Sequence, residues 1–544
     1  MTLTKFCVLM LALLVISSAH CPSITPIILE LKSNNGIFRY EFIVDAEGNA
    51  HVKIIYSSDL QMGSSWVLVP RFIKWVNRTI YGDLLRCVID EPERYTGSQY
   101  YFYKVLRFDF TSGRMGFKVV IEYNFPLAAM VVESESTYGI FYSPQIGFDP
   151  KNLFEAIVVF PENFRARKHE AIALGKGVIY NADGDSNSSH VLFKNIPVGE
   201  NLLRIQIGFD LTGGRADTVV LREGIFEFIT VARYEKYAQK IIDFYNTAYN
   251  ALVNIFNVTL DHVGAKFFIP DFHTLMSIGG YIPFSGGRLG DIYINLMFTR
   301  YMEGYLEVAA LHELAHHFMW KAGIPPEKLL WFHEGMAQFI SIEIAESMGY
   351  EGGRIIKEDI DGLIRALKLS TRSNLGFLVE WTPYYAPRET EVLYASAYYI
   401  ISELSEEYGG LEYYSKFFRL FGNVSLESNS MLCYYLSLAA NTSLFDKFNS
   451  WGFNLPDIYA YRPLIIEVEK AIGSVNQRTL FLQPFRKMAE LFYLIAVSGG
   501  VSSESTRLFL LAALFVAKFA RPIALITYSC ILLLVILLMI LKSR

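Results

Sequence analysis

Hydrophobic and polar residues alternate with a period of two from about residue 24 to residue 215. The alternation is clearest at 38–42 and 52–54, which flank a polar turn, and again at 106–110 and 117–119, which flank a second turn. A period of two is typical of strands with one buried face, and strands on either side of turn residues predict hairpins. We therefore predict two hairpins within a β-sandwich-like domain over residues 24–215.

The period changes to between three and four after about residue 216. Apolar residues recur every three or four positions between 234 and 255, which predicts an amphipathic helix. Strand-like segments follow at 265–269 and 291–295, and the pattern is mostly helical from 303 to about 498. Strands that precede the helices, rather than alternating with them, predict an α+β fold.

Both ends of the chain carry long apolar runs. Residues 1–21 combine a lysine, an 11-residue apolar run and small residues, as a secretory signal peptide does; an uncleaved N-terminal anchor is the alternative. The 19 residues 523–541 carry no charge and would be ~28 Å long as a helix, which predicts one transmembrane helix rather than a buried core helix. A second apolar run at 508–517 is expected to lie on the membrane or dip into it.

These two ends predict a single-pass type I protein of the cell membrane with its body outside the cell. The segment 471–505 would then be juxtamembrane and 506–544 the membrane anchor. Five N-x-S/T sequons lie between the two apolar ends and agree with an exterior body: Asn77, Asn187, Asn257, Asn423 and Asn441.

Composition narrows the functional classes. Only 19% of the residues are charged, the net charge is -5 and no basic run occurs, which argues against nucleic acid as a partner and against a disordered chain. Five cysteines in 544 residues exclude a disulfide-rich scaffold, and a bridge between Cys87 and Cys433 is compatible with the sequence.

One short segment carries residues suited to metal chemistry. Residues 312–317 read His-Glu-Leu-Ala-His-His within a stretch free of Gly and Pro, so a helix is expected there. On a helix, His312 and His316 project from one face, which is the arrangement that two zinc ligands need. Glu313 lies ~100° around the helix and could accept a proton from a water molecule beside the metal. The alternative is a structural helix with two satisfied histidines.

A catalytic zinc site requires a third protein ligand and one open position. After Pro325-Pro326 the segment Trp331-Phe332-His333-Glu334-Gly335-Met336-Ala337 begins a second helix. Glu334 is the favoured third ligand, and the adjacent His333 is the alternative. The metzincin pattern fails, because Met319 and Ala322 occupy its Gly and His positions.

The strings HELAHH and WFHEGMAQF resemble the gluzincin metallopeptidases, in particular the aminopeptidase N-like (membrane alanyl aminopeptidase) family. That family joins H-E-x-x-H to a W-x-x-E-G-x-A segment after 18 intervening residues, where this chain has 17. The resemblance implies that His312, His316 and Glu334 bind Zn2+ and that Glu313 is the general base. It also implies a thermolysin-like zinc peptidase domain over 216–350, completed by a helical subdomain over 351–470.

The family also places a tyrosine about 60 residues beyond the third ligand, where it hydrogen-bonds the oxyanion of the intermediate. Tyr394, in Val392-Leu393-Tyr394-Ala395-Ser396-Ala397, occupies the similar position, although Ser396 and Ala397 replace the Lys and Gly of that pattern. A phenol can donate a hydrogen bond to developing negative charge without ionising. A core tyrosine is the alternative, since the chain has 34 tyrosines.

The G-x-M-E-N segment, with which the family's exopeptidases hold a free amine, is missing. Gly286, Gly287 and Arg288 lie at a similar distance before the metal helix and are the expected substrate-binding residues, but they offer a cation instead of an acid. The strand at 291–295 could pair with an extended peptide. We expect His317 to orient Glu313, with a plain surface histidine as the alternative, and we expect Gln338, one turn after Glu334, to contact a metal ligand.

The sequence therefore predicts a membrane-anchored, extracytoplasmic zinc peptidase that acts on peptides or proteins, with the choice between exopeptidase and endopeptidase open. A surface adhesion protein with a non-catalytic metal helix is the alternative from another class. An epoxide or ester hydrolase that uses the same metal site is a third hypothesis.

Overall fold

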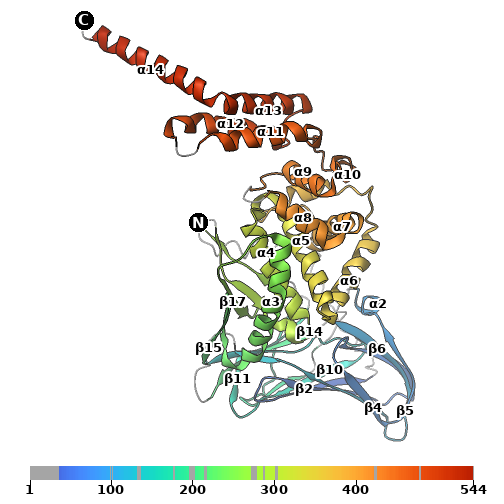
Figure 1. The fold of residues 1–544 in the computed structure, drawn as a ribbon. Coiled ribbons are helices and arrows are strands. Elements are labelled where there is room, and N and C mark those ends of the chain that lie inside the picture. Colours follow the sequence, from blue (N-terminus) through green and yellow to red (C-terminus); the bar gives the residue numbers. More distant parts are fainter. Residues whose placement is uncertain are drawn as a thin grey trace.

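The computed structural model describes residues 36–542, except for 98–99, 101, 132–136, 176–177, 195, 197–202, 213–216, 271–278, 286–287, 301–303, 422–424 and 477–478. The expected signal peptide at 1–21 lies outside the described residues. Figure 1 shows three parts in succession: β-sheets at one end, a helical body in the middle and a group of long helices at the other end. The predicted α+β fold class is confirmed, with strands first and helices after them.

The N-terminal part consists of three sheets around one core of buried aromatic and aliphatic side chains. A six-stranded sheet has the order β13-β10-β1-β2-β7-β4, a five-stranded sheet the order β12-β11-β14-β9-β8, and a three-stranded sheet the order β3-β6-β5. Their bounds are β1 Ile37–Val44, β2 Ala50–Ser58, β3 Met62–Pro70, β4 Trp75–Tyr81, β5 Asp83–Asp90, β6 Tyr103–Thr111, β7 Phe117–Phe125, β8 Ala129–Val131, β9 Tyr138–Tyr142, β10 Leu153–Val159, β11 Phe164–Gly175, β12 Val178–Asn181, β13 His190–Lys194 and β14 Leu203–Leu211.

One of the two predicted hairpins is confirmed and the other is wrong. β1 and β2 pair antiparallel from Ile37↔Ser57 to Val44↔Ala50. β6 and β7 do not pair with each other: β6 lies between β3 and β5, and β7 lies between β2 and β4. Phe110 and Phe117, the residues flanking the turn, stack at 4.3 Å in the core instead. Alternation and turn residues identify the strands, but they do not determine which sheet each strand joins.

The middle part combines a second five-stranded sheet with a stack of helices. Its sheet has the order β15-β16-β17-β21-β18, with β15 Thr218–Glu223, β16 Phe226–Val231, β17 Val263–Phe268, β21 Ile292–Asn295 and β18 Gly280–Tyr281. A separate two-stranded sheet is formed by β19 Phe284–Ser285 and β20 Arg288–Leu289. The helices are α3 Glu235–Phe256, α4 Tyr305–Lys321, α5 Pro326–Ser347, α6 Glu351–Leu367, α7 Thr390–Tyr408, α8 Gly410–Phe421, α9 Asn429–Ala440 and α10 Phe445–Ser450.

The β-part is fixed to the middle part by a buried arginine. Arg300 is 1% exposed, and its guanidinium donates to the main-chain carbonyls of Leu127 and Ala128. Tyr234 adds a second connection, because its hydroxyl accepts a hydrogen bond of 2.7 Å from the Val131 amide. Buried polar groups bonded across a boundary cost free energy when they are separated, so these contacts hold the two parts in one orientation.

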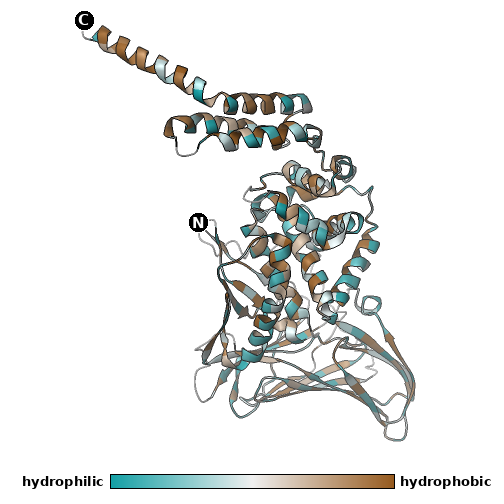
Figure 2. Cartoon of the chain, viewed as in Figure 1, coloured by the Kyte–Doolittle hydropathy of each residue, from teal (hydrophilic) through white to brown (hydrophobic). Residues whose placement is uncertain are grey.

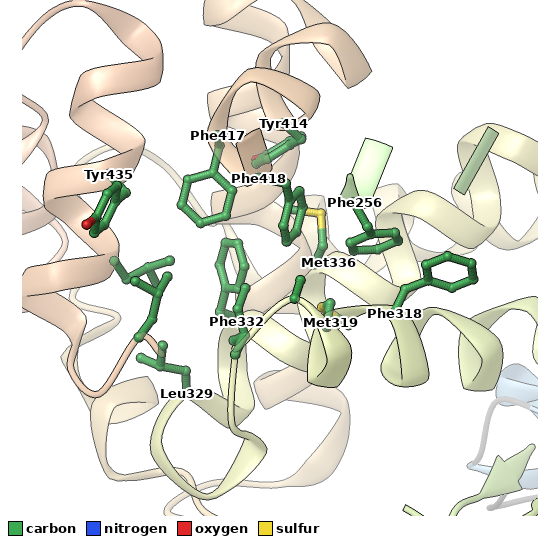
Figure 3. Packing of buried hydrophobic residues seen from close by; sticks show 14 of the residues in the cluster. Phe256, Phe318, Met319, Leu329, Phe332, Met336, Tyr414, Phe417, Phe418 and Tyr435 are labelled. Carbon is green, nitrogen blue, oxygen red and sulfur yellow. The ribbon is translucent and has the colours of Figure 1, made fainter. Parts of the chain in front are cut away.

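An apolar core supports α4 and α5 from behind. Figure 3 shows Phe318 of α4 and Phe332 of α5 among the rings of α8 and α3. Phe318 stacks on Phe256 at 5.4 Å, and Phe332 meets Phe417 edge-on at 5.6 Å. Interiors packed this densely hold side chains in fixed rotamers. The backbones of α4 and α5, which carry the residues on their other faces, are therefore held rigidly.

The C-terminal part contains α11 Arg462–Ser474, α12 Gln483–Val497, α13 Ser503–Lys518 and α14 Ala520–Lys542. The short turn η7, Leu480–Leu482, precedes α12. Among the described residues, α14 is the helix long and apolar enough to cross a membrane, with a mean hydropathy of 2.9 and 6% of its best window buried. Figure 2 shows it as a mostly hydrophobic helix that projects from the rest of the chain.

Cys87 and Cys433 do not form the bridge that the sequence left open. Cys87 is an exposed free cysteine on β5, and Cys433 is a buried free cysteine on α9. Figure 1 places β5 in the N-terminal sheets and α9 on the far side of the helical body. A disulfide requires Cα atoms within about 7 Å of each other, which this separation does not allow.

Candidate metal centre

The candidate metal ligands come from two helices that are anchored separately. The hydroxyl of Tyr245 on α3 donates to the Ala310 carbonyl at 2.9 Å, two residues before the HELAHH segment of α4. On α5, the indole of Trp331 donates to Asn429 at 2.7 Å. Leu329 has a non-helical backbone (φ -136°, ψ 46°), so α5 changes direction just before its Glu334. Pro325 and Pro326 lie at the start of α5, and the kink at Leu329 follows three residues after Pro326.

His312, His316 and Glu334 converge at one point. The Oε2 atom of Glu334 lies 3.2 Å from Nε2 of His312 and 3.6 Å from Nε2 of His316. One candidate ligand atom from each residue lies within 4.8 Å of the other two. The side chains are only 13%, 13% and 14% exposed, so the site is largely closed to solvent.

This donor set fits zinc. Zinc bonds of about 2.0–2.2 Å at tetrahedral angles place neighbouring ligand atoms ~3.3–3.6 Å apart, and the two spacings to Glu334 are 3.2 and 3.6 Å. Two imidazoles and one carboxylate are also the three-ligand set of catalytic zinc sites that keep a fourth position open. Such a site would attract the metal without rearrangement of either helix.

Charges within the site favour an ionised Glu334. Burial opposes its charge, but His316 and the hydrogen bonds of both imidazoles outweigh burial and hold the pKa of Glu334 well below its usual value. Burial lowers the pKa of His316 as well, and the Glu334 charge more than reverses that, so its pKa is raised. A carboxylate that stays ionised is ready to bind a cation.

His333 contacts His316 and does not join the cluster of ligand atoms. Its Nε2 lies 2.8 Å from the Ile324 carbonyl oxygen, which can only accept, so Nε2 carries the proton. Burial, with His316 nearby, lowers the pKa of His333 to about 3, so the ring is neutral and its Nδ1 is an acceptor. Nδ1 of His316, 2.9 Å away, is therefore the donor. When His316 is neutral, its lone pair is therefore on Nε2, which lies 3.6 Å from Oε2 of Glu334.

We predict that His333→Ala weakens zinc binding by about 10- to 100-fold, the usual cost of removing a partner that orients a metal-bound histidine. His333→Asn should recover most of the loss, because its amide oxygen can accept from Nδ1 of His316. Chelator competition on the purified chain measures both affinities. Equal affinities for the parent chain and His333→Ala would contradict this role.

Glu313 lies beside the three converging residues without being one of them. It is 7% exposed, and burial raises its pKa, with partial compensation from His316 and His312. Its side chain passes directly against the main chain of β18: a Cβ added to Gly280 would come within 2.6 Å of the Glu313 Cγ. Gly280 is a site residue that sequence reasoning missed. Its only signal is a glycine within a short strand, which often marks a close backbone approach.

Gly280→Ala is expected to displace the Glu313 carboxylate and lower kcat for substrate cleavage by about 10²-fold, since an error near 1 Å at a reacting group has effects of that size. Gly184→Ala is the matched control, because a Cβ there meets nothing within 4 Å. Steady-state kinetics of both variants, each with its zinc content measured, make the comparison. Unchanged kcat in Gly280→Ala would show that Glu313 tolerates the extra methyl group.

Tyr394 reaches the same site from α7. Its ring packs edge-on against Trp381 at 5.3 Å, and burial, followed by Glu334 and Glu313, raises its pKa well above the usual value. The phenol therefore keeps its proton and can donate it in a hydrogen bond. The close approach of α7 to α5 depends on Gly335, where a Cβ would meet the Ala397 carbonyl oxygen at 2.8 Å.

The remaining predicted site residues are Gly286, Gly287, Arg288 and Gln338. Gly286 and Gly287 lie outside the described residues. Arg288 is exposed on β20, in the two-stranded sheet apart from β18. The main-chain carbonyl of Gln338 accepts a hydrogen bond of 3.0 Å from the Ser341 hydroxyl.

His317, expected beside Glu313, instead faces the Gly290–Asp291 turn. Burial, followed by His316, lowers its pKa to about 4, while Asp291 and the Gly290 carbonyl partly offset this. On α4 the residue next to His316 is rotated by ~100°, which turns its ring away from the converging ligands.

No protein-family model and no curated protein matches the sequence. The fold is similar to that of yeast (Saccharomyces cerevisiae) LTA4 hydrolase in complex with bestatin, with 12% identity, a TM-score of 0.30, and 91% of this chain and 85% of that chain covered. It is also similar to that of an M1 zinc metallopeptidase from Deinococcus radiodurans, with 15% identity, a TM-score of 0.30, and coverages of 77% and 93%. Similarities at this level assign no activity, so the proposal below depends on the site.

Proposed function

We propose that this chain is a zinc-dependent peptidase. The observation that carries the proposal is the convergence of two imidazoles and a carboxylate at zinc-ligand spacing, beside a buried glutamate outside the ligand set. Structural zinc sites are normally closed by four protein ligands, whereas three leave a position for water and substrate. Hydrolysis also needs an acidic side chain next to the open position of the zinc, and Glu313 lies there. A purely structural zinc site needs no such residue.

Zinc held by His312, His316 and Glu334 would polarise a peptide carbonyl and make a water molecule more acidic. Glu313 then accepts the proton of that water and returns it to the departing amine, which a carboxylate with a raised pKa does readily near neutral pH. Tyr394 donates its phenolic hydrogen to the carbonyl oxygen as negative charge develops there.

The edge that could bind substrate is β18. The sequence pointed to the strand at 291–295, but that strand, β21, has β17 on one side and β18 on the other. β18 ends the five-stranded order among the described strands and carries Gly280 beside Glu313. An extended peptide that pairs with β18 would therefore bring a peptide bond to the general base.

We further propose a type I membrane protein with the peptidase body outside the cell. α14 supports a membrane span by its length and apolarity. Four of the five sequon asparagines are in described residues, and all four are exposed: Asn77, Asn187, Asn257 and Asn441. Extraction of expressing membranes at alkaline pH, followed by glycosidase treatment, tests this. Release of the chain at alkaline pH would exclude an integral membrane protein.

Cleavage assays with the purified full-length chain test the peptidase proposal. Matched peptides with a free or an acetylated amino terminus should be hydrolysed in the presence of zinc. A chelator should abolish cleavage, and added zinc should restore it. Preference for the free amine would indicate an exopeptidase, and equal rates would indicate an endopeptidase. Substoichiometric zinc together with no turnover of any peptide or ester would favour the adhesion alternative.

A further inference from the structure

The outward face of α13 carries a continuous apolar stripe. Leu508, Leu511 and Phe515 of α13 and Phe519, directly after its last residue, are 67%, 44%, 58% and 48% exposed and recur every three or four residues, so they line one side over ~16 Å. Isolated exposed apolar residues are ordinary, but an unbroken stripe that includes two phenylalanines is not.

The opposite face of α13 packs against α11 and α12, with Leu510, Ala513 and Ala517 buried. Figure 1 shows α13 as the outermost of these three helices, with α11 and α12 between it and the helical body. The apolar stripe therefore faces away from the enzyme body, on the side of the molecule from which α14 projects.

The stripe runs directly into the candidate membrane span. α14 begins two residues after α13 ends, and its first turns pack on η7 and α12, where Phe485 meets Tyr528 edge-on at 6.3 Å. η7 adds Leu480 and Phe481, which are 85% and 49% exposed. Once α14 enters a bilayer, these contacts bring η7, α12 and α13 to its surface.

Charged groups border the stripe in the arrangement expected at a lipid surface. Arg507, Lys518 and Arg521 are exposed at its two ends, and one anion, Glu504, precedes it. Lys518 also pairs with Glu467 of α11 at 2.5 Å, which ties the C-terminal end of α13 to its neighbour. Basic residues beside an apolar helix face are typical of interfacial helices.

We propose that α13 is a membrane-interface helix: it lies flat in the headgroup region of the bilayer, with its apolar stripe inserted, and holds the peptidase body against the surface. This rests on the proposed span by α14. A second copy of the chain is a poorer occupant, since stable interfaces bury about 800 Å² per partner, more than four side chains along ~16 Å of helix supply.

The test places an indole on the stripe of the full-length chain. Leu508→Trp and Phe515→Trp report from the two halves of α13. Two variants are controls. Ile466→Trp is at a 52% exposed position that shares its side of α11 with Lys470, and Met115→Trp is at a 70% exposed position in the turn between β6 and β7. Each variant is reconstituted in phosphatidylcholine–phosphatidylglycerol vesicles with or without lipids brominated near the headgroup, and its emission is compared with that of the parent chain.

Brominated lipid should remove about half or more of the added emission from Leu508→Trp and Phe515→Trp, and little from either control. Quenching of the stripe variants no greater than that of Met115→Trp would overturn the inference. An indole shielded from aqueous acrylamide but untouched by brominated lipid would also overturn it, in favour of a protein partner. Failure of the chain to float with the vesicles would contradict both the membrane span and the interface helix. Peptide cleavage in detergent tests the proposed active site independently of that result.

Discussion

Glu313→Gln should lower kcat for peptide cleavage by about 10²- to 10⁴-fold, the usual contribution of a positioned general base, while zinc content stays at the parent level. The amide keeps the size of the buried side chain but cannot accept a proton from water. Because Glu313 is not among the three converging residues, the metal ligands remain intact. Steady-state kinetics with metal analysis of the same sample measure both quantities.

Tyr394→Phe is expected to have a smaller effect than Glu313→Gln and serves as a comparison for it. It removes one hydroxyl that stabilises developing charge, so kcat should fall by about 10²-fold with little change in KM. Parental turnover by Glu313→Gln would refute the general base, and parental turnover by Tyr394→Phe would refute only the oxyanion donor.

Glu334→Ala should remove both zinc and activity. Its Oε2 atom is the one within 3.6 Å of both histidine nitrogens, so without it two imidazoles remain on a single helix. The affinity loss should exceed that of His333→Ala, which leaves all three ligands in place. Chelator competition ranks the two variants. A greater loss in His333→Ala would identify His333 as the third ligand.

Sequence spacing could predict that His312, His316 and Glu334 lie close together, because the segments that carry them are close in the chain. Two histidines four residues apart face the same way on any helix, and the second motif follows after a short turn. The contact between His333 and His316 could not be foreseen, because it depends on the non-helical backbone at Leu329 and on where the Ile324 carbonyl lies.

Features that depend on tertiary packing could not be predicted from the sequence. The strings around β6 and β7 predicted a hairpin, yet β6 pairs with β3 and β5, and β7 pairs with β2 and β4. Gly280 gave no motif, although β18 brings it against Glu313. The apolar run at 508–517 was visible, but only its packing against α11 and α12 shows which face of the helix is left outside.

X-ray absorption on the zinc-loaded full-length chain, with metal stoichiometry from the same sample, tests the central claim most directly. We predict one zinc per chain with two imidazole nitrogens and carboxylate or water oxygens at about 2.0–2.2 Å, and loss of that signal in Glu334→Ala. Substoichiometric zinc, or the same spectrum in Glu334→Ala, would contradict the proposed metal centre.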